Sequence, residues 1–178
     1  MSRVHAFVDE SKRRGYLFAA VLIEPSDLPV VRSTMRSLLL RGQSSVHLRK
    51  EGERRQRIIL AAVCRLPARA LVVSGPGHDL AAARAACLTT LAEAALARNV
   101  LRLTIEQADG DLDADRRTLF NVVGSVSGRR DRVLYEHVRR TGEPALWAAD
   151  AVAWAAAKGG EWRRRLDPLP VESLQIDR

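Results

Sequence analysis

Aromatic residues are scarce in this sequence: three Trp, two Tyr and three Phe make up 4% of its 178 residues. A core of this size needs most of these rings, so few remain for a surface on which bases could stack. Cysteine is also rare. Cys64 and Cys87 lie in apolar, helix-like segments without metal-ligand spacing, so we expect buried thiols rather than a disulfide framework.

Long hydrophobic runs are missing as well. No stretch reaches about 18 uninterrupted apolar residues, the length that a membrane span needs. The short apolar run at the start is followed at once by the acidic pair Asp9-Glu10, which is unlike a signal peptide. We therefore expect a cytoplasmic protein that does not enter a membrane.

Two loops lack the residues of familiar binding motifs. Gly75-Pro76-Gly77 has neither the lysine nor the serine or threonine of a phosphate-binding loop, so we expect a turn there. The acidic loop from Asp109 to Asp115 lacks the glycine and the glutamate that a calcium loop requires. We expect it to be solvated and to cap a helix, although Asp109 or Asp111 can supplement a metal site.

Arginine is what the sequence has in excess. Lys and Arg together number 29 against 21 Asp and Glu, which gives a net charge of +8. Clusters such as Lys12-Arg13-Arg14 and Arg49-Lys50 suit a polyanion, because guanidinium groups pair with phosphates and release counterions. A soluble surface that uses arginine in place of lysine would have the same composition. Nucleic acid is thus the expected partner, and a merely solvated surface is the alternative.

The hydrophobic pattern predicts alternating strands and helices. Strand patterns at 4–9 and 16–24 flank a polar turn, so the chain should open with an antiparallel hairpin. The later segments are predicted as helix 28–39, a short strand at 45–48, helix 51–66, strand 70–74, an Ala-rich helix after Asp79, strand 100–106, helix 115–126, edge strand 132–138 and a last helix from Pro144. We therefore predict one three-layer α/β domain over residues 1–166, with a mixed central sheet and helices on both faces. Residues 167–178 should form a loosely packed or disordered tail.

Three acidic residues end or interrupt apolar segments. Asp9 ends the first strand, Glu106 ends a later one, and Asp150 is embedded in Ala, Val and Trp. A buried carboxylate is costly unless it is neutral, hydrogen-bonded or bound to a cation. If the fold gathers the three, their oxygen atoms suit Mg²⁺ or Mn²⁺, and two such ions support phosphodiester cleavage. The alternative is that each acid caps a turn or pairs with an arginine.

Four segments together resemble a known family. They are Phe7-Val8-Asp9-Glu10-Ser11, Val46-His47-Leu48-Arg49-Lys50, Leu103-Thr104-Ile105-Glu106 and Leu146-Trp147-Ala148-Ala149-Asp150-Ala151-Val152-Ala153-Trp154-Ala155. In this order they are similar to the domain-of-unknown-function 3800 family, a branch of the ribonuclease H-like superfamily. The resemblance covers about residues 4 to 158. It implies a ribonuclease H-like fold and a nuclease that uses two metal ions.

The same resemblance implies roles for individual residues. Asp9 would be the central metal ligand, Glu106 the second and Asp150 the third, with Glu10 as a possible helper. His47 would orient a water molecule or accept a proton.

Basic residues beside these motifs would contact the substrate. Arg49 and Lys50 would face the scissile phosphate, and the turn Lys12-Arg13-Arg14 would bind nucleic acid.

The chain also departs from the family pattern. Lys12 stands where glycine is usual, Trp147 replaces a glutamine, and Glu106 replaces an aspartate. Lys12 and Trp147 favour an alternative in which the fold and the basic surface are kept but metal affinity is lost. The protein would then be a catalytically inactive (silent) nucleic-acid-binding module.

A protein–protein adaptor is the third alternative. Trp147, Trp154 and Trp162 are spaced to lie near one helix face, which favours core packing or the seam of a homodimer over base stacking.

Overall fold

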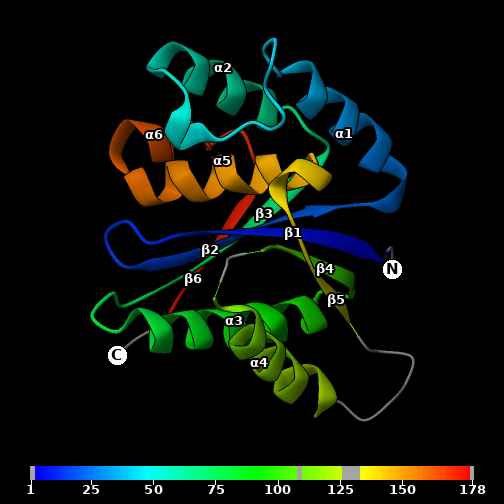
Figure 1. The fold of residues 1–178 in the computed structure, drawn as a ribbon, viewed down its shortest axis with the longest axis vertical. Helices are drawn as coiled ribbons and strands as arrows, with labels where there is room; N and C mark the ends of the chain where they lie inside the picture. Colours follow the sequence, from blue (N-terminus) through cyan, green and yellow to red (C-terminus); the bar gives the residue numbers. More distant parts are fainter. Residues whose placement is uncertain (1–2, 108–109, 126–132, 177–178) are drawn as a thin grey trace.

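The computed structural model describes residues 3–107, 110–125 and 133–176. Its centre is one six-stranded mixed sheet in the order β5-β4-β1-β2-β3-β6 (Figure 1). The strands are β1 (Val4–Ser11), β2 (Tyr16–Ile23), β3 (Ala68–Gly75), β4 (Val100–Glu106), β5 (Leu134–Val138) and β6 (Val171–Gln175). The predicted opening hairpin and edge strand are confirmed.

Strand direction sets where the ends of the strands meet. β2 is antiparallel to both of its neighbours, β1 and β3. β4 and β5 run parallel to β1, and β6 runs parallel to β3. The carboxyl ends of all strands except β2 therefore lie along one edge of the sheet. Side chains that end these strands are brought together there, although they are far apart in the sequence.

Helices cover both faces of the sheet, which confirms the predicted three layers (Figure 1). One face packs against α1, α2, α5 and α6, and the other against α3 and α4. Their bounds are α1 (Leu28–Ser37), α2 (Glu53–Val63), α3 (Leu80–Ala97), α4 (Leu112–Gly124), α5 (Ala145–Lys158) and α6 (Gly160–Arg164). Single 3₁₀ turns, η1 (Pro25–Asp27), η2 (Leu48–Lys50) and η3 (Arg140–Gly142), connect some of these elements.

Two helices, α5 and α3, pack directly on opposite faces of the sheet. α5 is almost entirely buried and contacts β1 and β2, because its many alanines let the helix approach the sheet closely. α3 is long and apolar enough by length and composition to cross a membrane, but here it packs on β2, β3 and α4 as a core helix. Asp79 caps α3 by accepting hydrogen bonds from the backbone of Ala81 and Ala82.

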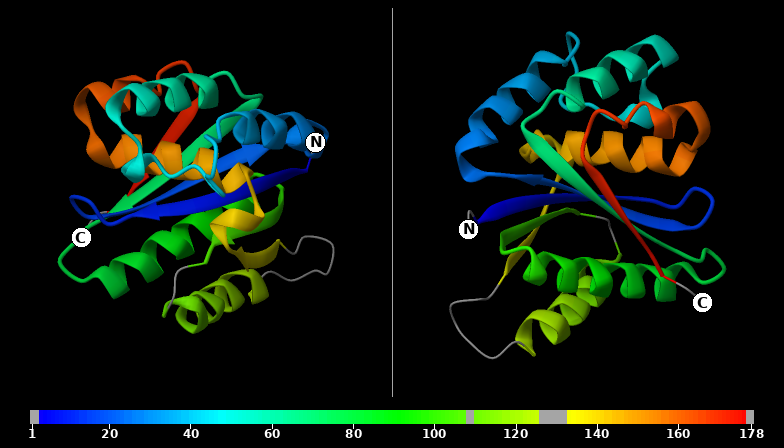
Figure 2. Two further views of the ribbon diagram at one scale, coloured as in Figure 1. Left: turned by 45° about the horizontal axis from the view of Figure 1, so that its top comes forward. Right: turned by 180° about the vertical axis from the view of Figure 1, so that it is seen from behind.

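Three predictions about local structure need correction. Residues 45–48 do not form a strand, because this segment leads into the 3₁₀ turn η2. The tail expected to pack loosely contains β6, whose backbone pairs with β3 at the edge of the sheet, as Figure 2 shows from behind. The three tryptophans do not share one helix, because Gly159 and Gly160 have φ angles of +73° and +55° and end α5 before Trp162.

Candidate active site

The alternation of side chains along the strands places Asp9 and Glu106 on the same face of the sheet. Val8 and Ile105 are register partners in β1 and β4, and both point toward the α3 layer. The next residue of each strand therefore points to the opposite face, which α5 covers. Asp9 and Glu106 thus meet α5 at the carboxyl ends of two neighbouring strands.

Arg140 lies among the three predicted acids. Its Nε and Nη2 donate to the two oxygens of Glu106, at 2.9 and 2.7 Å. Nη2 also contacts Asp9 Oδ2 at 3.3 Å, and Nη1 lies 3.0 Å from Asp150 Oδ1. The structure therefore brings Asp9, Glu106 and Asp150 together, from two strands and one helix, around a single guanidinium group.

Asp150 ties the loop that carries His47 to α5. Its Oδ2 accepts the backbone N–H of Leu48 at 2.8 Å, and its Oδ1 lies 2.9 Å from His47 Nδ1. Burial raises the pKa of this carboxyl, but the contacts with His47 and Arg140 outweigh it and leave the pKa below its usual value. Asp150 is thus a charged group with most of its acceptor positions used.

The pKa of Asp9 is shifted in the opposite direction from that of Asp150. Only 5% of the residue is exposed, and its pKa is raised well above its usual value by burial and by the negative charges of Asp150 and Glu106. Its Oδ1 accepts the backbone N–H of Glu10 at 2.7 Å. The carboxyl of Asp9 is therefore short of positive charge, even with Arg140 beside it.

The chemistry of these donors suits a hard cation, but their arrangement holds a guanidinium. Carboxylate oxygens are the ligands that Mg²⁺ and Mn²⁺ prefer. In the described part of the chain, however, no three His, Cys, Asp or Glu side chains are arranged to hold a metal ion. Arg140 supplies a single positive charge, which the three carboxylates share.

Glu10 lies on the other face of the sheet from these acids. It pairs with Arg84 of α3, and Arg84 also forms a bidentate ion pair with Asp115 at 2.7 Å. His137 Nε2 completes the cluster, 3.0 Å from Asp115 Oδ2. The structure therefore separates Glu10 from Asp9, and it places the side chain of His137 in a buried ionic cluster.

The remaining acids of the predicted site also lie elsewhere. Asp111 is near Arg84 and Lys12, at 3.6 and 3.9 Å. Asp109 lies outside the described residues.

The basic residues predicted to bind nucleic acid are exposed in two places. Arg49 and Lys50 form the end of η2, directly after His47 and Leu48. Lys12, Arg13 and Arg14 form the turn between β1 and β2, at the edge of the sheet where Asp9 lies. Both groups are therefore at the side of the molecule that holds the acids.

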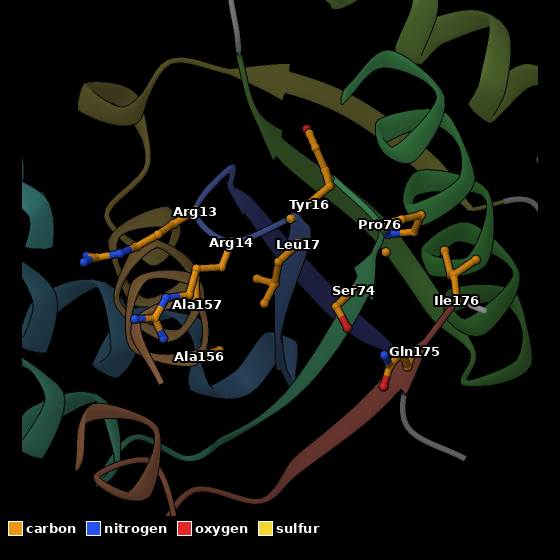
Figure 3. A pocket seen from close by; sticks show the side chains of 12 residues that line it. Arg13, Arg14, Tyr16, Leu17, Ser74, Pro76, Ala156, Ala157, Gln175 and Ile176 are labelled. Carbon is orange, nitrogen blue, oxygen red and sulfur yellow. The ribbon is translucent and has the colours of Figure 1, made fainter. Parts of the chain in front are cut away.

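A cavity of about 550 Å³ opens beside the β1–β2 turn (Figure 3). Arg13 and Arg14 line it together with Ser74 and Gln175, from the ends of β3 and β6. The turn can approach β3 closely because Gly15 has a φ of +117°, and a Cβ at this position would lie 3.0 Å from the carbonyl oxygen of Gly75. The cavity thus combines two cationic groups with two neutral hydrogen-bonding side chains.

Two residues of the site could not be identified from the sequence pattern. Arg140 is one of a pair of arginines in a chain rich in arginine, and nothing local distinguishes it. Trp147 was noted for replacing a glutamine and for its spacing from two other tryptophans, yet its Nε1–H donates to the carbonyl oxygen of Arg140 at 2.8 Å. The indole therefore keeps a polar function at this position.

Solved structures with a similar fold include two ribonucleases. A structure of the complex of PCNA and RNase HII from Archaeoglobus fulgidus matches with a TM-score of 0.58 and 18% identity, over 87% of this chain and 73% of that chain. Ribonuclease H2 from Pyrococcus horikoshii OT3 matches with a TM-score of 0.54 and 11% identity, over 87% of this chain and 72% of that chain. The chain therefore has a ribonuclease H-like α/β fold.

Comparisons with models of known families and with curated proteins found no match. The resemblance to the domain-of-unknown-function 3800 family stays a prediction.

Proposed function

We propose that this protein is a divalent-metal-dependent nuclease that hydrolyses phosphodiester bonds in RNA, DNA or an RNA–DNA hybrid. The observation that carries the proposal is the meeting of Asp9, Glu106 and Asp150 on one face of the sheet, around a single cation. Three carboxylates would not be gathered in a buried place without a positively charged partner. The neighbours of the same fold are ribonucleases.

In this proposal each acid has a separate part in holding Mg²⁺ or Mn²⁺. Asp9 would be the central ligand, because its side chain is the least exposed of the three and its negative charge is the least compensated. Glu106 and Asp150 hold the ions from β4 and α5. Bound there, the ions would supply an activated water molecule and would stabilise the leaving oxygen of a phosphodiester.

His47 and the basic residues would act on the substrate. His47 has one ring nitrogen beside Asp150, so the carboxylate fixes the orientation of the ring. The other nitrogen can then orient a water molecule or accept its proton. Arg49 and Lys50 are exposed next to His47 and would bind the phosphates that flank the cleaved bond.

The cavity beside the β1–β2 turn would bind a more distant phosphate of the strand. Arg13 and Arg14 supply the charge, while Ser74 and Gln175 can donate hydrogen bonds to phosphate or sugar oxygens. Such contacts would increase affinity without selecting a sequence.

Cleavage of labelled single-stranded, duplex and hybrid RNA and DNA with Mn²⁺ tests the proposal. We expect activity in the wild type and a loss of at least about a hundredfold, the usual scale for removing a group that stabilises the transition state, in Asp9→Asn and Asp150→Asn. Asp113→Asn, which changes an exposed carboxylate on α4, is the matched control and should keep full activity. Unchanged cleavage in Asp9→Asn would refute the assignment.

A silent nucleic-acid-binding module is the second candidate. The observation in its favour is Arg140, which already occupies the place where a metal ion would bind. Such a module would bind RNA or DNA equally well in chelator and after Asp9→Asn, and it would cleave neither.

A further inference from the structure

The guanidinium of Arg140 uses each of its three nitrogens on the carboxylates. Nε is bonded to Glu106, Nη2 lies between Glu106 and Asp9, and Nη1 reaches Asp150. These contacts take up an oxygen of every predicted ligand. An ion that binds the same oxygens cannot share them with a guanidinium, because both cations need the same lone pairs and would repel each other.

The contacts of His47 show that the observed position of the Arg140 guanidinium is partly unfavourable. Its Nδ1 lies 2.9 Å from Asp150 Oδ1 and 2.5 Å from Nη1 of Arg140. If Nδ1 carries a proton, it donates to Asp150 but faces a second donor on Arg140. If Nδ1 has no proton, it accepts from Arg140 and offers nothing to Asp150. With Arg140 in place, one of these two contacts therefore lacks a bonding proton.

The backbone of Arg140 is fixed separately from its side chain. The residue begins η3, and its carbonyl oxygen accepts the indole N–H of Trp147. The side chain has several rotatable bonds and is 18% exposed, so it has a route to solvent. The guanidinium can therefore leave the carboxylates while the loop stays in place.

We propose that Arg140 is an internal competitor of the divalent ion: the guanidinium and the metal exclude each other from Asp9, Glu106 and Asp150. The inference rests on the proposed nuclease function, since it assigns the same three carboxylates as ligands. Arg140 offsets part of the negative charge of the three acids when no ion is bound, and it lowers the metal affinity that the protein shows. If the guanidinium contacts the carboxylates for about nine-tenths of the time or more, the observed affinity for the metal ion is weaker than that of the free carboxylates by about tenfold or more.

Titration calorimetry with Mn²⁺ tests the competition without relying on activity. We expect Arg140→Gln to bind Mn²⁺ at least about tenfold more tightly than the wild type. Arg139→Gln removes the same charge from an exposed neighbour and should bind like the wild type. Equal or weaker binding by Arg140→Gln than by a wild type that binds Mn²⁺ would overturn the competition and leave the nuclease proposal standing. Binding by none of the three proteins would overturn both.

Nitrogen-15 NMR of the wild type gives a second test, which holds even if Arg140→Gln fails to fold. The Nε–H of Arg140 is bonded to Glu106, and the signal can be assigned by its absence in Arg140→Lys. Saturation with Mg²⁺, verified by calorimetry on the same sample, should shift this signal toward that of a solvent-exposed arginine. An unchanged signal in the saturated protein would overturn the competition.

Discussion

The indole Nε1–H of Trp147 donates a hydrogen bond to the backbone carbonyl oxygen of Arg140, at 2.8 Å. Trp147 is buried in the core between α5 and the sheet, so this bond links η3 to the hydrophobic core. Trp147, in the first turn of α5, therefore positions Arg140, whose guanidinium lies among the three acids.

Trp147→Phe tests this link. The ring stays apolar, but the carbonyl oxygen of Arg140 loses its short hydrogen bond and keeps only the 3.5 Å contact with the backbone N–H of Glu143. We therefore expect a decrease of about 1 kcal/mol in the free energy of unfolding beyond the effect of the smaller ring. The control is Trp154→Phe, which makes the same change on α5 and keeps an aromatic ring against Trp162. Urea denaturation of both variants measures the difference. Equal losses in the two variants would mean that the hydrogen bond does not contribute.

Much of the site could be predicted from the sequence because its elements are regular. The apolar run before Asp9, the alternation before Glu106 and the Ala-rich segment around Asp150 each place an acid at a defined position of a strand or helix. The period of two also separates Asp9 from Glu10 onto opposite faces, so the expectation that Glu10 assists its neighbour conflicts with the strand that both were predicted to end.

The parts that sequence reasoning missed depend on contacts between distant segments. Arg140 differs from the other arginines because the fold brings the acids of β1, β4 and α5 to the start of η3, where it pairs with all three. β6 has no alternating pattern, and it forms because the exposed edge of β3 offers backbone partners from Ala70 to Ser74. Backbone pairing of this kind needs little from the side chains, so composition does not reveal it.

Asp115→Asn tests the ionic cluster beneath the sheet, where Arg84 and His137 contact the same carboxylate. Burial raises the pKa of Asp115, but the hydrogen bonds from Arg84 and His137 outweigh it and lower the pKa below its usual value of 3.8. A lowered pKa means that the carboxylate stabilises the fold above about pH 4, and that this contribution is lost as the pH falls further. Near pH 6 we expect Asp115→Asn to be less stable by about 3 kcal/mol, because Arg84 loses a buried partner.

The difference between wild type and Asp115→Asn should therefore shrink between about pH 5 and pH 3. Urea denaturation of both proteins across this range measures it. Glu10 and Asp111 also face Arg84, and both side chains are present in both proteins, so their direct contributions largely cancel in the comparison. A difference that stays constant down to pH 3 would show that the charge of Asp115 does not stabilise the fold.

Asp9→Asn should stabilise the protein in the absence of metal. The pKa of Asp9 is raised by burial and by the charges of Asp150 and Glu106, so at neutral pH its carboxylate opposes folding. Asparagine removes the charge and keeps an oxygen that can accept the backbone N–H of Glu10. What it gives up is the contact with Arg140, which at 3.3 Å is the longest of the three ion pairs that this arginine makes in the site.

We therefore expect Asp9→Asn to increase the free energy of unfolding in chelator at pH 7, by about 1 kcal/mol, the usual scale of a single substitution. Asp113→Asn, on the exposed face of α4, should change it little. Mn²⁺ should then reverse the order, because only the wild type gains stability by binding the ion. A variant that is less stable than the wild type in chelator would show that the attraction of Arg140 for Asp9 outweighs the repulsion among the acids. In that case the cluster would be an ordinary structural ion network, and the main reason to expect a metal ion there would be gone.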